Sequence, residues 1–393
     1  MQKTSLNKPK KLRVIFDGEP VVMDHFSGIG HYTVELLKEI DHNIHLYPGL
    51  KVDMIVHSKR LDKARALGFK NIRLLSSPFS LRISNGLKIR AKQPPLDLLF
   101  GRGLYVFPNY TSWPLVASKC VSFIYDLSYE KYPQYASPPL QRFLSTQVWK
   151  SVKRSSRIAT ISNNSRNELG DFYSIPEEKI GVYYPAVDHK RYFKINSALT
   201  SKTLVKYGID VPYILFVGNI EPRKNLVNLL LAYEKLPKKL RGKYKLLLVG
   251  AKGWQDNEIH DTIKRLNSKE ECVIFPSHYV TDEDIPAFFS GASVFAYPSV
   301  YEGFGIPPIE AMACGAPVVC ADNSSLPEAA GDAALLVNAD SVEDISLAIE
   351  NVLSDSSLAQ KLIDKGYKQA EKFSWEVTAR QFLDDLYKLY EYK

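Results

Sequence analysis

The sequence predicts an α/β protein made of two doubly wound parallel sheets in tandem. Short apolar runs alternate along the chain with stretches whose apolar residues recur at helical spacing, which is the pattern of strand–helix–strand units. The runs lack a regular polar–apolar alternation, as expected for parallel strands that helices cover on both faces. The chain has 393 residues, whereas a single core usually stops growing at about 250 to 300. We therefore predict two Rossmann-like domains.

The first half contains the apolar runs expected for seven strands. They fall at residues 11–18, 52–58, 71–75, 103–109, 119–126, 157–162 and 179–186. Between the first two runs, residues 28–40 have the apolar spacing of a helix, with Tyr32 and Leu36 on the same face. This half therefore has enough strands and helices for a complete domain.

The second half repeats the pattern more clearly. Its six predicted strands fall at residues 212–218, 244–250, 271–276, 293–299, 316–321 and 334–338. Helical stretches lie between them at residues 225–236, 282–292 and 307–315. The polar segment 185–212 lacks a strand pattern, so we predict domains over residues 1–187 and 188–373. An amphipathic helix follows at residues 374–393.

The net charge of +8 is unevenly distributed. Residues 1–200 contain 30 Lys and Arg against 16 Asp and Glu, whereas the remaining residues contain 21 against 27. Segment 63–96 is the most basic, with eight Lys and Arg, no acidic residue and several apolar ones. Such a surface suits anionic lipid headgroups or another polyanion. A charged surface that only keeps the protein soluble is an equally good interpretation.

The sequence shows no sign of export or membrane insertion. Its start is basic, but no apolar stretch follows, which argues against a secretory signal. No run approaches the ~18 apolar residues that a membrane-spanning helix needs. The four cysteines lack Cys-x-x-Cys spacing and have apolar neighbours, so we expect buried thiols in a reducing compartment. These features predict a cytoplasmic protein, placed at the inner face of the membrane if the basic segment binds lipid.

The most informative stretch is PSVYEGFGIPPIEAMACGAPVV, residues 298–319, which follows a predicted strand. Gly303 and Gly305 allow the backbone to approach a ligand closely. Pro307 suits the first position of a helix, and Gly315 suits its end. The amides at such a helix start carry partial positive charge, which suits phosphate or sugar oxygens.

Two glutamates belong to the same stretch. Glu302 falls in the turn before the predicted helix, and Glu310 falls in its first turn. Because a carboxylate can accept two hydroxyl groups at once, each glutamate suits a sugar or a ribose. For Glu310, simple complementarity to the helix dipole is the alternative.

A second motif, FVGNIEPRKN, ends another strand at Gly218. Arg223 and Lys224 come just before a helix that begins near Asn225. Two adjacent cations at the carboxyl edge of a sheet could neutralise a diphosphate without a metal ion. Ligands bind at this edge in open α/β sheets, at the point where the strand order reverses. The alternative is two ordinary surface cations.

Two further patterns are weak. Gly28 and Gly30 give a loose Gly-x-Gly after the first strand, but the full dinucleotide-binding pattern is not completed, and a turn without ligand is as good an interpretation. Asp282 and Asp284 spell Asp-x-Asp, a metal–nucleotide signature elsewhere. Here Thr281 is expected to cap a helix whose first turn holds the two aspartates.

Taken together, VGNIEPRKN, PSVYEGFGIPPIEAMACGAPVV and SSLPEAAGDAALLV resemble glycosyltransferase family 4, and the EPRKN form resembles its mannosyltransferase-like branch. The resemblance covers the whole second domain and, more loosely, the first. It implies the GT-B fold, in which two Rossmann-like domains face each other across a cleft and the terminal helix crosses back to the first. The first domain would bind the acceptor and the second the nucleotide-sugar donor.

The resemblance also implies a site. The family's Glu-x7-Glu pair falls on Glu302 and Glu310, and its basic pair falls on Arg223 and Lys224. Many members have an arginine where Asn219 stands, so Arg223 is expected to supply that charge. The donor site would further include Gly218, Asn219, Tyr279, Val280, Gly303, Phe304, Gly305 and Ile306.

In the first domain, the family's glycine loop falls on Gly28 to Gly30. Its His-Asp dipeptide falls on Tyr125 and Asp126, so a tyrosine stands where a histidine is common. Tyr125 is therefore either a donor-facing ring or a core residue that fills the end of a strand. Its ordinary pKa near ~10 makes it a poor base at neutral pH.

The reaction implied is a retaining transfer that needs no cofactor and no metal. Arg223, Lys224 and the amides of residues 303–306 would stabilise the departing diphosphate. Glu302 would orient the donor sugar and Glu310 the ribose, while Tyr279 and Val280 would meet the base. The expected donor is GDP-mannose, with dTDP-rhamnose or a UDP-sugar as alternatives.

The expected acceptor is a saccharide or a lipid-linked saccharide in cell-surface polysaccharide or glycan synthesis, and no nucleic acid partner is expected. Two other functions remain open from the sequence. A nucleotide-sugar epimerase of the same fold would process the donor without any acceptor. A non-catalytic nucleotide-sugar-binding subunit would bind the donor and release no nucleotide.

Overall fold

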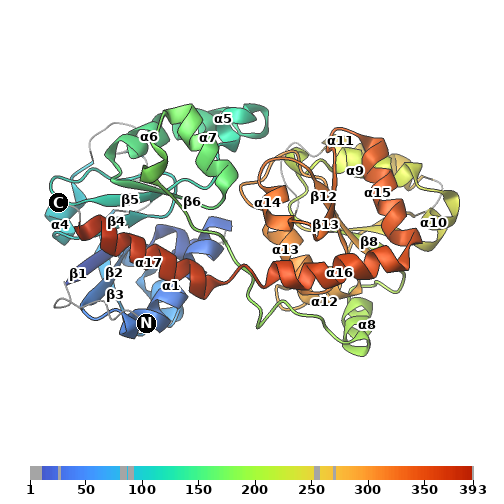
Figure 1. The fold of residues 1–393 in the computed structure, drawn as a ribbon, viewed down its shortest axis with the longest axis horizontal. Coiled ribbons are helices and arrows are strands. Elements are labelled where there is room, and N and C mark those ends of the chain that lie inside the picture. The colour runs from blue at the N-terminus through green and yellow to red at the C-terminus, as the bar shows by residue number, and fades with distance from the viewer. Residues whose placement is uncertain are drawn as a thin grey trace, which may run out of the picture. The chain divides into compact units, whose positions relative to one another are not determined.

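The computed structural model describes residues 11–24, 28–79, 86, 93–251, 257–268 and 271–391 (Figure 1). The chain divides into two compact units, and each is built around one parallel sheet. The first unit comprises residues 1–184 with 375–393, and the second comprises residues 185–374. This is the predicted fold class, and the strand–helix alternation that predicted it recurs in both units.

The sheet of the first unit has seven strands in the order β3-β2-β1-β4-β5-β6-β7. Their bounds are β1 (Leu12–Asp17), β2 (Leu50–His57), β3 (Ile72–Ser77), β4 (Leu104–Phe107), β5 (Cys120–Phe123), β6 (Arg157–Thr160) and β7 (Ile180–Val182). Each lies within one of the seven predicted runs or overlaps it. The helices are α1 (Gly28–Asn43), α2 (Leu61–Ala66), α4 (Leu96–Phe100), α5 (Ser128–Lys131), α6 (Pro138–Arg154), α7 (Asn163–Tyr173) and α17 (Trp375–Glu391).

The sheet of the second unit has six strands in the order β10-β9-β8-β11-β12-β13. Their bounds are β8 (Tyr213–Val217), β9 (Lys245–Val249), β10 (Val273–Ile274), β11 (Val294–Tyr297), β12 (Val318–Ala321) and β13 (Ala334–Val337). The helices are α8 (Ser197–Lys206), α9 (Leu226–Lys235), α10 (Lys238–Lys243), α11 (Asn257–Leu266), α12 (Ile285–Gly291), α13 (Ile306–Ala313), α14 (Leu326–Ala330), α15 (Val342–Ser354) and α16 (Ser356–Ala370).

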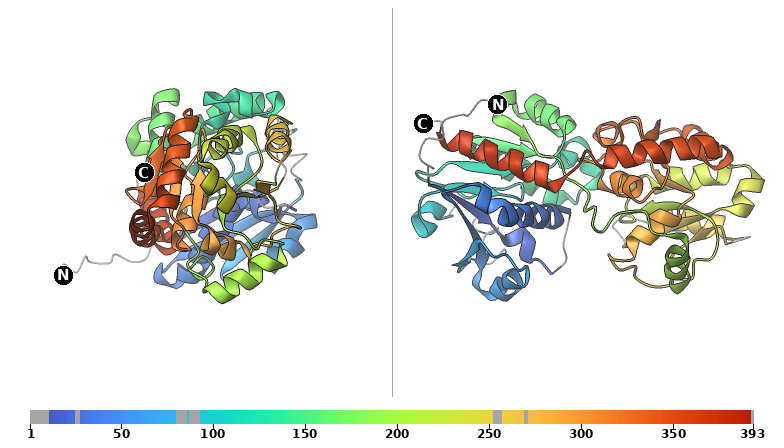
Figure 2. Two further views of the ribbon diagram at one scale, coloured as in Figure 1. Left: turned by 90° about the vertical axis from the view of Figure 1, so that its right-hand side faces the viewer. Right: turned by 60° about the horizontal axis from the view of Figure 1, so that its bottom comes forward.

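The terminal helix returns to the first unit, as predicted. The chain leaves α16 in the second unit, and α17 then lies along the first beside α1 (Figure 2). Phe382 of α17 is fully buried and packs against Phe16, Phe123 and Tyr183, with ring centroids 5.0 to 6.3 Å apart. Burying one such side chain contributes roughly 1.5–3 kcal/mol. The helix is therefore part of the core of the first unit.

Partly buried polar contacts hold the same helix in place. Asp385 accepts a hydrogen bond from the Tyr183 hydroxyl at 2.9 Å and pairs with the Arg157 guanidinium at 2.7 Å. Thr378 also donates its hydroxyl to the Tyr184 carbonyl at 2.7 Å. These contacts set the position of α17 along its axis, which apolar packing alone leaves less defined.

Three local predictions are wrong. The helix expected from Asp282 begins only at Ile285, because the Asp284 amide bonds the Thr281 carbonyl in a turn, so Thr281 is not the N-cap. Ile306, not Pro307, is the first residue of α13, which puts Glu310 beyond its first turn. Gly28 and Gly30 lie in the first turn of α1, where the predicted helix 28–40 begins, and not in the glycine loop that the family resemblance implied.

Candidate active site

Both sheets reverse their strand order at one place, between β1 and β4 in the first unit and between β8 and β11 in the second. The strands on either side of a reversal send their connections to opposite faces of the sheet, which leaves a crevice at their carboxyl ends. Ligands of open α/β sheets bind in that crevice. The residues that follow β8 and β11, and those that follow β1 and β4, are therefore the first candidates for function.

In the second unit, the segment after β8 carries the predicted cation pair. Arg223 and Lys224 lie in a short 3₁₀ turn, Pro222–Lys224, and Asn225 follows with a left-handed backbone (φ 59°). The Asn225 side chain donates to the Pro298 carbonyl at 3.0 Å, and the Val300 amide donates to the Arg223 carbonyl at 3.0 Å. These bonds hold the turn against the segment that follows β11.

Glu302 lies after β11, and its carboxylate forms salt bridges with both Arg223 and Lys224. Its Oε1 accepts from the Lys224 ammonium at 2.6 Å and from the Tyr297 hydroxyl at 3.0 Å. Its Oε2 accepts from the Arg223 guanidinium at 3.0 Å. The other side of that guanidinium pairs with Glu221 at 2.8 Å. We call Glu221, Arg223, Lys224, Tyr297 and Glu302 the ion cluster.

Burial makes the ion cluster electrostatically strong. Burial alone would raise the pKa of Glu302, but Arg223 and Lys224 lower it to about 2. Lys224 is 7% exposed, and desolvation lowers the pKa of its ammonium although Glu302 opposes the shift. Burial is the largest cause of the raised pKa of the Tyr297 hydroxyl, and the nearby Glu302 charge raises it further. Glu302 is thus ionised, weakly basic and bonded through both oxygens.

The backbone after Glu302 is also held in place. The Glu302 amide donates to the Ser324 hydroxyl at 3.0 Å, and the Ser325 hydroxyl donates to the Glu302 carbonyl at 2.7 Å. Gly305 caps α13 with a left-handed backbone (φ 109°), and a Cβ there would lie 2.7 Å from Leu326. Only glycine fits this position. Gly303 and Phe304 are buried in the same segment, which leads into the amino end of α13.

Glu310 makes different contacts from Glu302. It lies in α13, and the Tyr192 hydroxyl hydrogen-bonds its carboxylate. Desolvation raises the pKa of Glu310 to about 8, against the opposing effects of Tyr192 and Arg191. The two glutamates of the motif are therefore chemically distinct, because the surroundings of Glu302 favour its ionised form and those of Glu310 favour its protonated form.

The remaining predicted donor-site residues of the second unit fall at two places. Gly218, with φ 152°, and the exposed Asn219 directly follow β8. A Cβ at Gly250, which follows the neighbouring strand β9, would lie 1.9 Å from the Gly218 carbonyl oxygen, so the two segments pass in close contact. Tyr279 is 76% exposed, whereas Val280 is 8% exposed, so only the tyrosine ring is open to stack on a flat ligand.

The Asp-x-Asp pattern is engaged in ion pairs. Asp284 accepts from the Lys206 ammonium at 2.7 Å and from the Tyr207 hydroxyl at 2.6 Å, and these bonds lower the pKa of its carboxyl. Asp282 pairs with Arg191 at 3.5 Å. Both carboxylates therefore have structural partners within the second unit.

In the first unit, Tyr125 belongs to the core. It is 5% exposed, and its hydroxyl donates to the Pro108 carbonyl at 2.9 Å. Its ring packs edge-on against Tyr32 at 5.5 Å and stacks with Phe123. This geometry matches the interpretation of Tyr125 as a packing residue.

The other predicted residues of the first unit are less informative. Asp126 accepts from the Tyr110 hydroxyl at 3.2 Å and from the Ser128 amide and hydroxyl, so its carboxylate orders the turn after β5. Gly30 is buried and Gly28 is exposed, and a Cβ at Gly28 would meet nothing within 4 Å. Among the described residues, none therefore requires a glycine at position 28.

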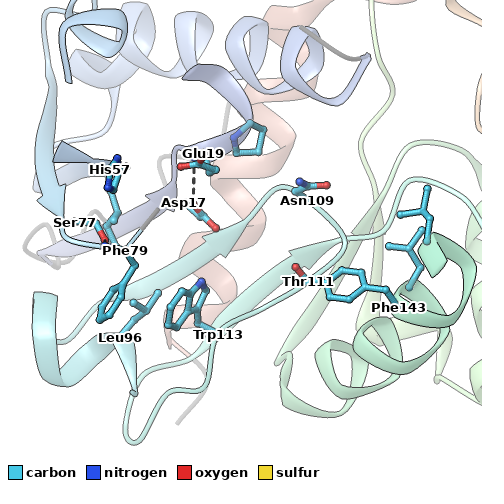
Figure 3. A pocket seen from close by; sticks show the side chains of 14 residues that line it. Asp17, Glu19, His57, Ser77, Phe79, Leu96, Asn109, Thr111, Trp113 and Phe143 are labelled. Atoms are coloured by element: carbon cyan, nitrogen blue, oxygen red, sulfur yellow. Dashed lines mark hydrogen bonds between the residues drawn. The ribbon is translucent and has the colours of Figure 1, made fainter. Parts of the chain in front are cut away.

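The sequence did not predict a cavity of about 220 Å³ in the first unit, at the reversal between β1 and β4. Its walls include Asp17 at the end of β1, His57 and Ser77 at the ends of β2 and β3, and Asn109 and Trp113 after β4. In Figure 3 the labelled polar side chains lie above Phe79, Leu96 and Trp113. We call this the β1–β4 cavity.

The signal for this cavity was present in the sequence but was not used. Asp17 and Asn109 each come directly after a predicted strand, and a strand order of the doubly wound type would have placed those ends together. Tyr297 and Tyr192 were missed for another reason. Their partners, Glu302 and Glu310, belong to other turns and helices, and one-letter code does not show which hydroxyl reaches which carboxylate.

Comparison with known proteins agrees with the fold. The family model described as Glycosyl transferases group 1 matches residues 204–369. The chain is 33% identical to O-antigen chain mannosyltransferase B of Escherichia coli over 387 residues, which covers 96% of this chain and all of the relative. It is 30% identical over 274 residues to the serotype-specific mannosyltransferase WbdA of the same organism, covering 69% of this chain and 33% of that one.

Solved structures show the same architecture. HepE of Anabaena, solved in complex with UDP-glucose, matches with a TM-score of 0.73 and 17% identity, covering 96% of this chain and all of that one. The sucrose-phosphate synthase of Thermosynechococcus elongatus matches with a TM-score of 0.70 and 19% identity, covering 98% and 100%. Identities this low establish the fold alone.

The two parallel sheets and these matches define a glycosyltransferase of the GT-B fold. Within that class, the full-length similarity to a mannosyltransferase of O-antigen synthesis identifies the family. The chain belongs to the group 1 glycosyltransferases, which is the family 4 type that its motifs resemble.

Proposed function

We propose that the protein is a retaining, metal-independent mannosyltransferase that uses GDP-mannose in the synthesis of a surface polysaccharide. A relative that matches 96% of the chain is an O-antigen chain mannosyltransferase, which supports both the sugar and the process. The observation that carries the mechanism is the ion cluster, because it holds the buried Lys224 and the half-buried Arg223 at the strand reversal of the second sheet.

The cations suit a diphosphate leaving group. As the bond between sugar and phosphate breaks, negative charge grows on the diphosphate, and fixed cations in a dry site stabilise it without reorganising. The ion cluster already holds the Arg223 and Lys224 side chains in fixed positions, and Glu302 and Glu221 balance their charge. In this proposal the diphosphate oxygens take over some of the contacts that Glu302 makes here.

Glu302 is a poor candidate for a covalent nucleophile or a base. Both of its oxygens are hydrogen-bonded, and its pKa of about 2 makes it a weak base at neutral pH. This supports a same-face substitution in which the leaving phosphate oxygen takes the acceptor proton. In this proposal, Glu302 orients the donor sugar once a donor covers the cations, Glu310 binds the ribose, and Tyr279 contacts the base.

The experiment is an assay of nucleotide diphosphates and sugar nucleotides. Thermal shifts should single out GDP, since a ligand at about 100 times its dissociation constant stabilises by roughly 2.7 kcal/mol. GDP-mannose with a saccharide acceptor should then give an α-linked product by NMR. A β-linked product would exclude retention, and an epimerised donor without acceptor would identify an epimerase instead.

The acceptor is proposed to be a saccharide on a lipid carrier, so that the enzyme works at the inner face of the membrane. None of the described helices is both long and apolar enough to cross a bilayer. In the basic segment 63–96, residues 80–85 and 87–92 lie outside the described residues. Of the described cations, Lys63 pairs with Asp24 and Arg73 with Asp53.

A further inference from the structure

Tyr297 joins two charged partners of the ion cluster without carrying a charge itself. Its hydroxyl accepts from the Lys224 ammonium at 2.7 Å and donates to Glu302 Oε1 at 3.0 Å. Lys224 and Glu302 also bond each other directly at 2.6 Å. The three groups therefore form a closed triangle, in which the phenol is both acceptor and donor. A phenylalanine would fill the same space but could make neither bond.

The core of the second unit holds the ring of Tyr297 in place. Tyr297 ends β11 and is 1% exposed. Its ring stacks with those of Phe216 on the neighbouring strand β8 and of Phe295, with centroids 5.8 and 5.7 Å apart. An aromatic side chain has only two torsions, and close packing fixes both. The hydroxyl is therefore a fixed point for the longer and more flexible side chain of Lys224.

The position of the Lys224 ammonium depends on this fixed point. The ammonium has three N–H groups. Within the part of the chain that the structure describes, Tyr297 and Glu302 take two of them, so one is left for a ligand. The lysine stem passes Gly218, where an added Cβ would lie 3.9 Å from Lys224 Cε. The ammonium is thus held close to the carboxyl end of β8, at the strand reversal.

We propose that Tyr297 is a positioning residue, which holds the Lys224 ammonium in place while an oxygen of the leaving diphosphate accepts its third N–H group. The diphosphate competes with Glu302 for this cation, because both are anions. The neutral hydroxyl of Tyr297 stays an acceptor of the cation and does not repel a phosphate. Tyr297 contacts neither substrate in this assignment and acts through Lys224. The inference rests on the proposed function, since it adds a residue to the site of the leaving group.

The same hydrogen bond stabilises the charged form of Lys224. Desolvation lowers the pKa of the ammonium, Glu302 and Glu221 raise it, and Arg223 lowers it further. A hydroxyl that accepts from the ammonium favours the charged form. Tyr297→Phe leaves those three charges unchanged, so loss of the acceptor should lower the pKa of Lys224. The variant should therefore lose the positive charge at a lower pH than the wild type.

The test measures the binding of inorganic pyrophosphate to the full-length protein by calorimetry, from pH 7 to pH 9. Pyrophosphate reports on the leaving-group site whatever the nucleotide and the sugar are. The variants are Tyr297→Phe and, as the matched control, Tyr213→Phe. Tyr213 is also 1% exposed, and its hydroxyl donates to the Phe288 carbonyl at 2.7 Å. It begins β8 and so lies at the end of that strand opposite to the ion cluster.

Tyr297→Phe should weaken pyrophosphate binding by roughly tenfold at pH 7, and its dissociation constant relative to the wild type should increase further towards pH 9. The ionisation of pyrophosphate itself cancels from that ratio. Tyr213→Phe should bind like the wild type at every pH. If Tyr297→Phe does not fold, replacement of Tyr297 by 3-fluorotyrosine keeps the ring and the hydroxyl but weakens the acceptor oxygen. The same dependence on pH is then expected with a smaller amplitude.

Two results would overturn the inference. One is a Tyr297→Phe protein that binds pyrophosphate as the wild type does. The other is a loss of affinity that is the same at every pH, because a purely structural role would weaken binding without changing the charge of Lys224.

Pyrophosphate also separates this inference from the proposed function. If the proteins bind it in the expected pattern but the wild type does not use GDP-mannose, the donor assignment alone is wrong. If the wild type does not bind pyrophosphate, both the leaving-group site and the role of Tyr297 are wrong.

Discussion

The Lys224 ammonium and the Glu302 carboxylate form a 2.6 Å salt bridge in which the two side chains are only 9% and 10% exposed. A buried pair is costly to break, because the remaining charge stays desolvated without a partner. In the proposed reaction, the substrate diphosphate becomes a further partner of the Lys224 ammonium. The bridge therefore links the stability of the second unit to the proposed donor site.

Glu302→Gln should destabilise the protein strongly. Breaking a buried ion pair costs about 3–5 kcal/mol, which lowers the melting temperature of a domain of this size by roughly 6–20 °C. The matched control is Glu343→Gln, whose carboxylate is 70% exposed and pairs with Lys235, so little change is expected. A melting temperature of Glu302→Gln equal to that of the control, measured by calorimetry, would contradict the description of the ion cluster.

Arg223→Ala and Lys224→Ala should each impair catalysis at least as much as donor binding. Loss of one charge-assisted contact is worth about 1.5–3 kcal/mol, or roughly 10- to 150-fold in kcat/KM. Because charge grows on the diphosphate in the transition state, kcat should fall at least as much as donor affinity. Lys235→Ala is the control, since its ammonium is half-exposed and lies in the surface pair with Glu343. A variant with weak donor binding and a normal kcat would show that the two cations stabilise the bound donor and not the transition state.

Glu310 should make stability depend on pH near neutrality. Its folded pKa, about 8, lies above the ordinary value of 4.5, so the fold favours the protonated form. This contribution is fully present below pH 4.5 and is lost as pH rises towards 8. Glu310→Gln cannot ionise and should remove that decline. The measurement is the free energy of unfolding from pH 5 to 8 for both proteins, and parallel curves would contradict the assignment.

The basic segment should direct the protein to anionic membranes. Binding to vesicles that contain phosphatidylglycerol should be strong at low salt and should fall as salt screens the charge. Replacing Arg82, Lys88, Arg90 and Lys92 by glutamine should abolish most of it. Replacing Lys63 and Arg73, which pair with Asp24 and Asp53, should matter less. Equal binding to neutral and anionic vesicles would count against a membrane role.

The strands were predictable because their signal is local. Each is a short apolar run between turn residues, and both sheets contain the number of strands that those runs indicate. The cation pair and Glu302 were predictable because they follow strands in recognisable motifs. Their mutual salt bridges were not, since they join residues 78 and 79 positions apart through a turn and a loop.

The remaining features of the site could not be predicted, because the sequence does not show in which direction each side chain points. Tyr125 follows a strand and stands at a family position, which left two interpretations open from sequence. Its ring packs against Tyr32 and its hydroxyl bonds the Pro108 carbonyl, and both partners lie elsewhere in the chain. Thr281 failed as an N-cap because Lys206 and Tyr207 draw Asp284 into a turn before the helix. Such tertiary contacts override local capping preferences.

The central claim is that Arg223 and Lys224 replace a metal ion at the leaving diphosphate. The most direct measurement is transfer from GDP-mannose to acceptor by the wild-type protein after dialysis against EDTA, with and without added Mg²⁺ or Mn²⁺. We expect the same turnover number under all conditions, whereas Lys224→Ala should remain slow even when metal is added. Activity that disappears with EDTA and returns with Mg²⁺ or Mn²⁺ would contradict the account.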